Sequence, residues 1–218
     1  MRRLFFVTFL FAPNALGQGP AEGPFPYDPK LIAQILAEAK TGDPRHGVEV
    51  FRAPQFACLG CHKVGKAGGT VGPDLSLLSR CLKPEQIVEA VLWPKREVKD
   101  EYKAISVVTT DGRAVTGYKE KENAKELVLR DPATGTTTTI LKADIDERKE
   151  IGSLMPDGLT AAMTPAQRRD LFRFLLELGK TEGLADLVHT HAHAVASFPI
   201  ERAPLKPEDW PHWKDHVN

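Results

Sequence analysis

The sequence of 218 residues predicts a mainly α fold with a small antiparallel β unit inserted between the helices. Two patterns lead to this prediction. On both sides of the insertion, apolar residues recur three and four positions apart in stretches that each begin with a proline, as in amphipathic helices. Over about residues 100–146 the side chains alternate instead, in runs rich in β-branched residues, which is typical of strands.

Four helices follow from their start and stop signals. The first two start at a proline behind an aspartate, whose side chain can cap the free backbone N–H groups. The last starts with a capping box, Thr164-Pro165-Ala166-Gln167, in which the first and fourth side chains cap each other's backbone. A further tight helical turn is expected at Cys58, followed by a glycine-rich loop to Gly72. The four helices begin at Asp28, Asp43, about Pro84 and Thr164, and end before Thr41, near Phe51, at Leu92 and before Gly179.

The β unit is expected to hold three to five strands. Asp111-Gly112 predicts a hairpin turn of type I′, in which both central residues need a positive φ. The charged run of residues 144–150 is expected to be a solvated face. Strands are expected over residues 102–109, 113–118, 126–130 and 136–141.

The N-terminus has the features of a secretory signal peptide over residues 1–17. Arg2 and Arg3 precede an apolar run over residues 4–11, and the small residues of Ala15-Leu16-Gly17 follow as a cleavage site. The apolar run is shorter than the roughly 20 residues that span a bilayer. We therefore expect a periplasmic or otherwise exported protein without a membrane span in its mature chain.

This organisation divides the chain into four parts. The signal peptide is followed by a linker and helix (residues 18–42), a helical domain that carries the insertion (residues 43–180), and a tail of little periodicity (residues 181–218). Basic and acidic residues number 29 each. This balance argues against a nucleic-acid partner, because proteins that bind nucleic acids usually carry a basic patch.

One motif carries chemistry, Cys58-Leu59-Gly60-Cys61-His62. Two thiols three positions apart on one helical turn can each add to a vinyl group of the same porphyrin edge, and the next residue can bind its iron. The motif therefore predicts one covalently bound haem c, attached through Cys58 and Cys61, with His62 as an iron ligand.

Three other interpretations of the two cysteines carry less weight. A zinc site needs two more ligands, and the only plausible donors are the tail histidines His189, His191 and His193. A thioredoxin-like redox pair would need a preceding strand and a following helix. A plain disulfide would leave His62 without a role. The third cysteine, Cys81, is expected to be a buried or free thiol.

Met155 is the expected sixth ligand of the iron. It lies in the loop Ser153-Leu154-Met155-Pro156 ahead of the last helix, and a thioether is a soft ligand that stabilises ferrous iron. Met163 is the rival thioether, but it adjoins the start of that helix and is expected to point elsewhere.

The cysteine motif stands among further motifs: Gly47, Phe51, residues 68–75, Asp111-Gly112-Arg113, residues 153–159 and Phe174-Leu175. With these motifs, the residues over about 43–179 resemble class I c-type cytochromes, and more closely the haem-binding domain family of planctomycetes and verrucomicrobia. The resemblance implies a cytochrome c-like helical haem domain, with His62 and Met155 as the two iron ligands. It also implies that the Pro73 carbonyl accepts the N–H of the His62 ring, and that Gly47 allows the first and last helices of the domain to cross closely.

The expected function is that of a monohaem electron carrier rather than an enzyme, passing single electrons between a donor and an acceptor protein, either by itself or as an electron-transfer module of a larger oxidoreductase. The alternative is a haem-based ligand sensor or a peroxidase-like protein, in which the sixth position is open or its ligand is displaced. A third possibility is an interaction module that docks through the β insertion.

Overall fold

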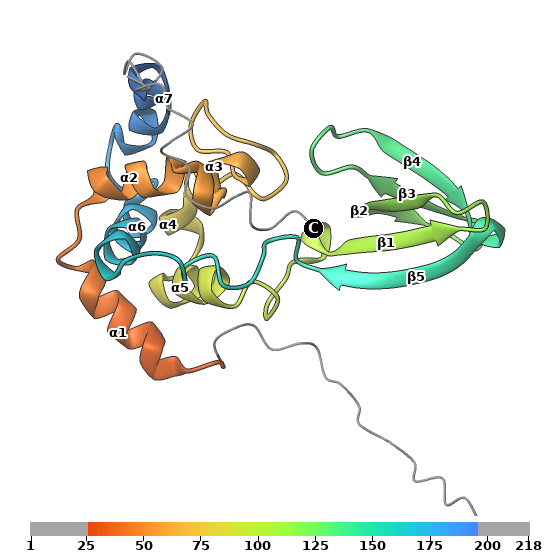
Figure 1. Ribbon diagram of the computed structural model, residues 1–218, viewed down its shortest axis with the longest axis horizontal. Coiled ribbons are helices and arrows are strands. Elements are labelled where there is room, and N and C mark those ends of the chain that lie inside the picture. Colours follow the sequence, from red (N-terminus) through yellow and green to blue (C-terminus); the bar gives the residue numbers. More distant parts are fainter. Residues whose placement is uncertain (1–25, 196–218) are drawn as a thin grey trace, which may run out of the picture.

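The computed structural model describes residues 26–195. The expected signal peptide lies outside these residues, as does the part of the expected tail beyond residue 195. Over the described part, seven α-helices gather on one side and a single antiparallel sheet lies beside them (Figure 1). Helices contain 40% of the described residues and strands 21%, so the fold is mixed α/β rather than mainly α. The insertion is also longer than expected, because its last strand reaches Gly152.

The four helices expected from the sequence are confirmed. Their starts are fixed by local contacts: the Asp28 side chain accepts a hydrogen bond from the Lys30 backbone N–H at 2.8 Å, and Thr164 and Gln167 form the expected capping box. These helices are α1 (Pro29–Ala39), α2 (Pro44–Arg52), α5 (Pro84–Leu92) and α6 (Pro165–Glu177).

Three further helices complete the helical part. The turn expected at Cys58 is α3 (Cys58–Cys61), whereas α4 (Leu78–Cys81) was not predicted. The expectation of a tail with little periodicity is wrong for residues 184–195, because α7 spans Leu184–Val195. Its Leu184 and Val188 are buried against the helical core.

Cys81, at the end of α4, is an exposed free thiol. Short 3₁₀ turns occupy Pro54–Phe56, Asp100–Tyr102 and Lys142–Asp144.

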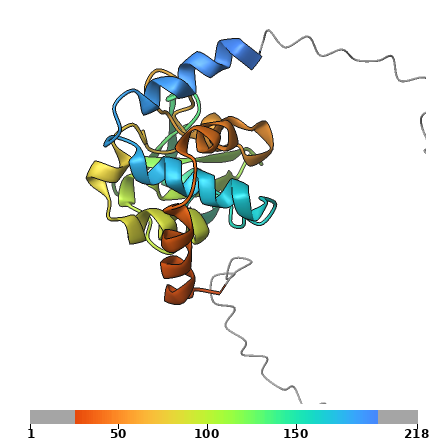
Figure 2. The same cartoon turned by 90° about the vertical axis from the view of Figure 1, so that its left-hand side faces the viewer.

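The core of the helical part is the crossing of α2 and α6, seen from the helical side in Figure 2. Phe51 and Phe174 meet there with ring centroids 5.4 Å apart. A Cβ on Gly47 would lie 2.5 Å from the Phe174 Cβ and closer still to the Asp170 carbonyl oxygen. Glycine at position 47 therefore permits the close approach of the two helices.

The sheet has the strand order β4-β3-β2-β1-β5, with every neighbouring pair antiparallel. Its apolar residues form a second core, separate from the helical one, around Ile105, Leu127 and Ile140. The charged run expected as a solvated face is itself the edge strand β5, and most of its residues are exposed. The strands are β1 (Ala104–Thr109), β2 (Ala114–Glu122), β3 (Glu126–Arg130), β4 (Thr137–Leu141) and β5 (Ile145–Gly152).

The turn between β1 and β2 is not of type I′. Gly112 has a φ of 82°, whereas the φ of Asp111 is not positive. In the described chain, Ala57 is the only non-glycine residue with a positive φ. The Asp111 carboxylate instead accepts hydrogen bonds from the Thr109 hydroxyl and the Arg113 backbone N–H. The Gly112 backbone N–H donates to the Thr109 carbonyl oxygen at 2.7 Å, so Thr110 and Asp111 are the central residues of the turn, and only the glycine that follows them is left-handed.

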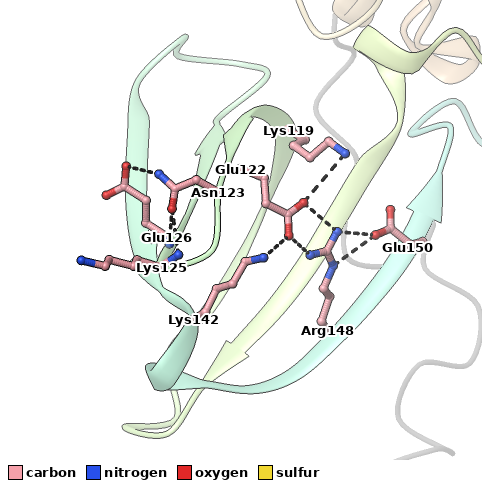
Figure 3. Close-up of polar contacts among 8 residues, drawn as sticks. All are labelled: Lys119, Glu122, Asn123, Lys125, Glu126, Lys142, Arg148 and Glu150. Atoms are coloured by element: carbon pink, nitrogen blue, oxygen red, sulfur yellow. Dashed lines mark hydrogen bonds and ion pairs between the residues drawn. The ribbon is translucent and has the colours of Figure 1, made fainter.

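A cluster of charged side chains, centred on Glu122, lies on the sheet (Figure 3). Arg148 of β5 binds Glu122 of β2 through two nitrogens, at 2.6 and 3.4 Å, and Lys142 reaches the same carboxylate at 2.9 Å. These hydrogen bonds, led by that of Arg148, lower the pKa of Glu122 to about 2. Because Glu122 is paired with Leu127 and Arg148 with Val107, the cluster shares a face with the apolar core of the sheet.

Candidate functional site

A cavity of about 340 Å³ lies where the helices meet the sheet, and all five residues expected at the site line it. They come from separate parts of the chain: the α3 turn supplies Cys58 and Cys61, His62 follows it, and Pro73 and Met155 come from two loops. Most of the other lining side chains are apolar and come from α4, α5, α6 and the connecting loops. A largely apolar cavity with a few convergent polar groups is typical of a cofactor site.

The two thiols are held by a single helical turn. Ala57 precedes it with a φ of 56°, and the His62 backbone N–H closes it on the Cys58 carbonyl oxygen at 2.9 Å. The Cys58 thiol donates a hydrogen bond to the Phe56 carbonyl oxygen at 3.5 Å. Burial raises the pKa of Cys58 to about 11, so this thiol remains protonated near neutral pH. A redox-active pair requires a thiolate of lowered pKa, which this environment opposes.

His62 is oriented by the backbone of Pro73. Its Nδ1 lies 2.9 Å from the Pro73 carbonyl oxygen, which is the contact that the resemblance implied. A carbonyl can only accept, so Nδ1 carries the proton and Nε2 is left with its lone pair. Burial lowers the pKa of His62, and the bond to Pro73 opposes that shift. A neutral imidazole with a free Nε2 is the form that binds a metal.

The loop that contains Pro73 runs alongside the cysteine motif. Backbone N–H groups of Gly69, Gly72 and Leu75 donate to the carbonyl oxygens of residues 59, 61 and 63, at 3.0, 2.8 and 2.8 Å. At the middle of this contact there is no room for a side chain: a Cβ on Gly72 would lie 2.7 Å from His62 Nδ1 and 2.9 Å from Nε2. Glycine at position 72 therefore allows the loop to lie directly against the imidazole.

Two thioethers line the cavity. Met155 is half-buried, and its backbone N–H donates to the Ser153 hydroxyl at 3.1 Å. Met163, which was expected to point elsewhere, also lines the cavity and is 7% exposed. That expectation was wrong because the segment ahead of α6 turns back along the cavity wall. Both methionines are therefore candidates for a ligand position.

Two tyrosines from the β insertion, Tyr102 and Tyr118, were missed by sequence reasoning. Both line the cavity, and their rings meet edge to face with centroids 5.8 Å apart. The Tyr118 hydroxyl donates to the Val71 carbonyl oxygen at 2.8 Å. Burial, with a smaller effect of Tyr102, raises the pKa of Tyr118 and keeps this hydroxyl a donor. No local signal marks them, because the contact joins residues 47 positions apart.

The donor set fits haem c. Two thiols on one turn, a neutral imidazole with a free Nε2 and two thioethers converge on an apolar cavity. Among the described residues, no group of three or more His, Cys, Asp or Glu side chains could hold a metal ion, so the zinc interpretation lacks its further ligands there. The side chains of His191 and His193 lie outside the described part. Over residues 26–195, no helix is long and apolar enough to cross a membrane.

Comparison with protein-family models finds no match to this chain, and comparison with curated proteins finds no similar sequence.

Proposed function

We propose that this protein is a monohaem c-type cytochrome that passes single electrons between redox partners outside the cytoplasm. The observation that carries the proposal is the convergence of Cys58, Cys61, His62 and Met155 on one apolar cavity, with the His62 ring already oriented by Pro73. The close crossing of α2 and α6 at Gly47 supports a cytochrome c-like arrangement of the helical part. The export signal expected over residues 1–17 supports a periplasmic location.

Each residue has a defined part in this proposal. Cys58 and Cys61 would hold the cofactor covalently through thioether bonds, and His62 Nε2 would bind its iron. The Pro73 carbonyl keeps the ring in one orientation and makes the imidazole a stronger donor. The Met155 thioether would supply the second protein ligand, and the largely apolar lining would limit the access of water. When bound, haem c supplies one-electron chemistry between ferric and ferrous iron.

The lining of the cavity favours an electron carrier over a peroxidase-like enzyme. Peroxide chemistry relies on polar side chains, typically a second histidine and an arginine, that move protons beside the bound peroxide. Among the lining residues of the described chain, His62 is the only histidine and there is no arginine. Two thioethers line the same cavity, so a second protein ligand to the iron is at hand.

The ligand assignment is tested by optical spectroscopy of the mature chain, produced with haem-maturation machinery. We expect the weak methionine-to-iron charge-transfer band of the ferric protein in wild type and in Met163→Ala, and its loss in Met155→Ala. Loss of the band in Met163→Ala but not in Met155→Ala would assign the ligand to Met163. A spectrum without the band, together with ready binding of carbon monoxide to the ferrous protein, would favour the ligand sensor instead.

A further inference from the structure

The loop that orients His62 is held from two sides. Its inner side is bonded to the cysteine motif, as described above, and its outer side is bonded to the β insertion. There the Tyr118 hydroxyl donates to the Val71 carbonyl oxygen at 2.8 Å, and the Thr70 hydroxyl donates to the Pro132 carbonyl oxygen at 3.4 Å. Val71 lies two residues before Pro73, whose carbonyl meets the imidazole. A continuous path of short contacts therefore joins the sheet to His62.

Tyr118 is fixed well enough to hold this loop. The residue is 3% exposed, its ring packs edge to face on Tyr102, and the Arg130 guanidinium lies 5.5 Å from its centroid on the sheet. Its backbone is part of β2 and is paired with Ala104 of β1 and Arg130 of β3. A side chain anchored on a central strand moves little, so its hydroxyl is a rigid support for the Val71 carbonyl.

We propose that Tyr118 is a positioning residue, through which the β insertion fixes the hydrogen bond between Pro73 and His62. The inference rests on the proposed function, because it concerns how strongly His62 donates to the iron. A firmly held carbonyl acceptor increases the electron donation of the imidazole. Stronger donation favours ferric iron and lowers the reduction potential. The insertion is thus part of the redox site as well as a neighbour of it.

The test compares Tyr118→Phe with wild type in the mature haem-containing protein. Phenylalanine keeps the ring contacts and removes only the hydroxyl. We expect the reduction potential to rise, and the Nδ1 proton of His62 to exchange faster with solvent in NMR spectra of the reduced protein. Tyr27→Phe, which removes a hydroxyl outside the cavity, is expected to leave both measurements unchanged. Tyr102→Phe removes a hydroxyl from the same cavity that is not hydrogen-bonded to the loop, and it is expected to shift both measurements less than Tyr118→Phe does.

The proposal is overturned if Tyr118→Phe leaves both the potential and the proton exchange at the wild-type values. It is also overturned if Tyr102→Phe has an equal effect, because the cause would then be the polarity of the cavity. Thr70→Val loosens the second contact of the same loop and should shift both measurements in the same direction, so the test does not depend on one variant folding. Failure of the proposed function has a different signature, the absence of covalent haem from wild type itself.

Discussion

Replacing Gly72 by alanine tests whether the loop must lie directly against the His62 ring. The added Cβ would be 2.7 Å from Nδ1 and 2.9 Å from Nε2, and closer to the carbon between them. Normal contacts between such atoms are about 3.5–4.0 Å. Either the ring or the loop must therefore move by about 1 Å, and the 2.9 Å hydrogen bond to the Pro73 carbonyl oxygen cannot survive that shift unchanged.

The expected loss of stability has two parts. Overpacking of a closed site costs about 1–3 kcal/mol. Loss of a part-buried hydrogen bond adds about 1 kcal/mol. The total of roughly 2–4 kcal/mol corresponds to a fall in melting temperature of roughly 5–15 °C for a chain of this size.

The matched control is Gly60→Ala, in the cysteine motif itself. A Cβ on Gly60 meets nothing within 4 Å, and neither glycine has a positive φ. Gly60 lies in α3, where alanine is a better helix former by up to about 1 kcal/mol. Thermal unfolding followed by circular dichroism should therefore show a large loss for Gly72→Ala and none for Gly60→Ala. Equal melting temperatures for the two variants would refute the packing argument.

Three further predictions concern stability. Glu122→Gln should reduce the unfolding free energy by about 1 kcal/mol at neutral pH, since the pair with Arg148 is partly exposed. Because the pKa of Glu122 is lowered to about 2, this contribution is present above the ordinary pKa of 4.5 and is lost as the pH falls through about 2. Urea titrations should therefore give wild type and variant the same unfolding free energy in acid and different ones at neutral pH. Gly47→Ala should cost about 3 kcal/mol by forcing α2 and α6 apart, and a melting temperature equal to wild type would contradict the close crossing. Thr164→Ala should cost about 1 kcal/mol through loss of the cap of α6, measurable by urea titration, whereas Thr164→Ser should restore it; equal loss in both would exclude capping as the cause.

The elements that could be predicted from sequence are those set by neighbouring residues. The Asp28 cap and the Thr164 capping box join residues two or three positions apart in the sequence, and the turn from Cys58 to Cys61 is equally local. The same holds for the strand pattern of β3, whose alternation of buried and half-buried residues follows its sequence. The contact between His62 and Pro73 spans 11 residues and was reached only through the resemblance.

The elements that could not be predicted depend on contacts between distant residues. Helix α7 has apolar residues at helical spacing, Leu184, Leu187 and Val188, which pack on the helical core, but its start lacks the proline that opens the four expected helices. Strand β5 shows no apolar alternation because most of it is exposed, and pairing with β1 defines it. Tyr118 and Met163 enter the site only through the way in which the chain folds back on the cavity.

The central claim is that Cys58 and Cys61 hold one haem, and mass spectrometry of the mature chain tests it most directly. The chain should be produced in a host that attaches haem to a known c-type cytochrome under the same conditions. We predict a mass increase of one haem per chain, retained after denaturation and located on a peptide that contains both cysteines. Cys81→Ser should keep the haem, whereas a variant with alanine at both positions 58 and 61 should lose it. A wild-type chain without covalent haem, in a host that loads the known cytochrome, would contradict the proposed function.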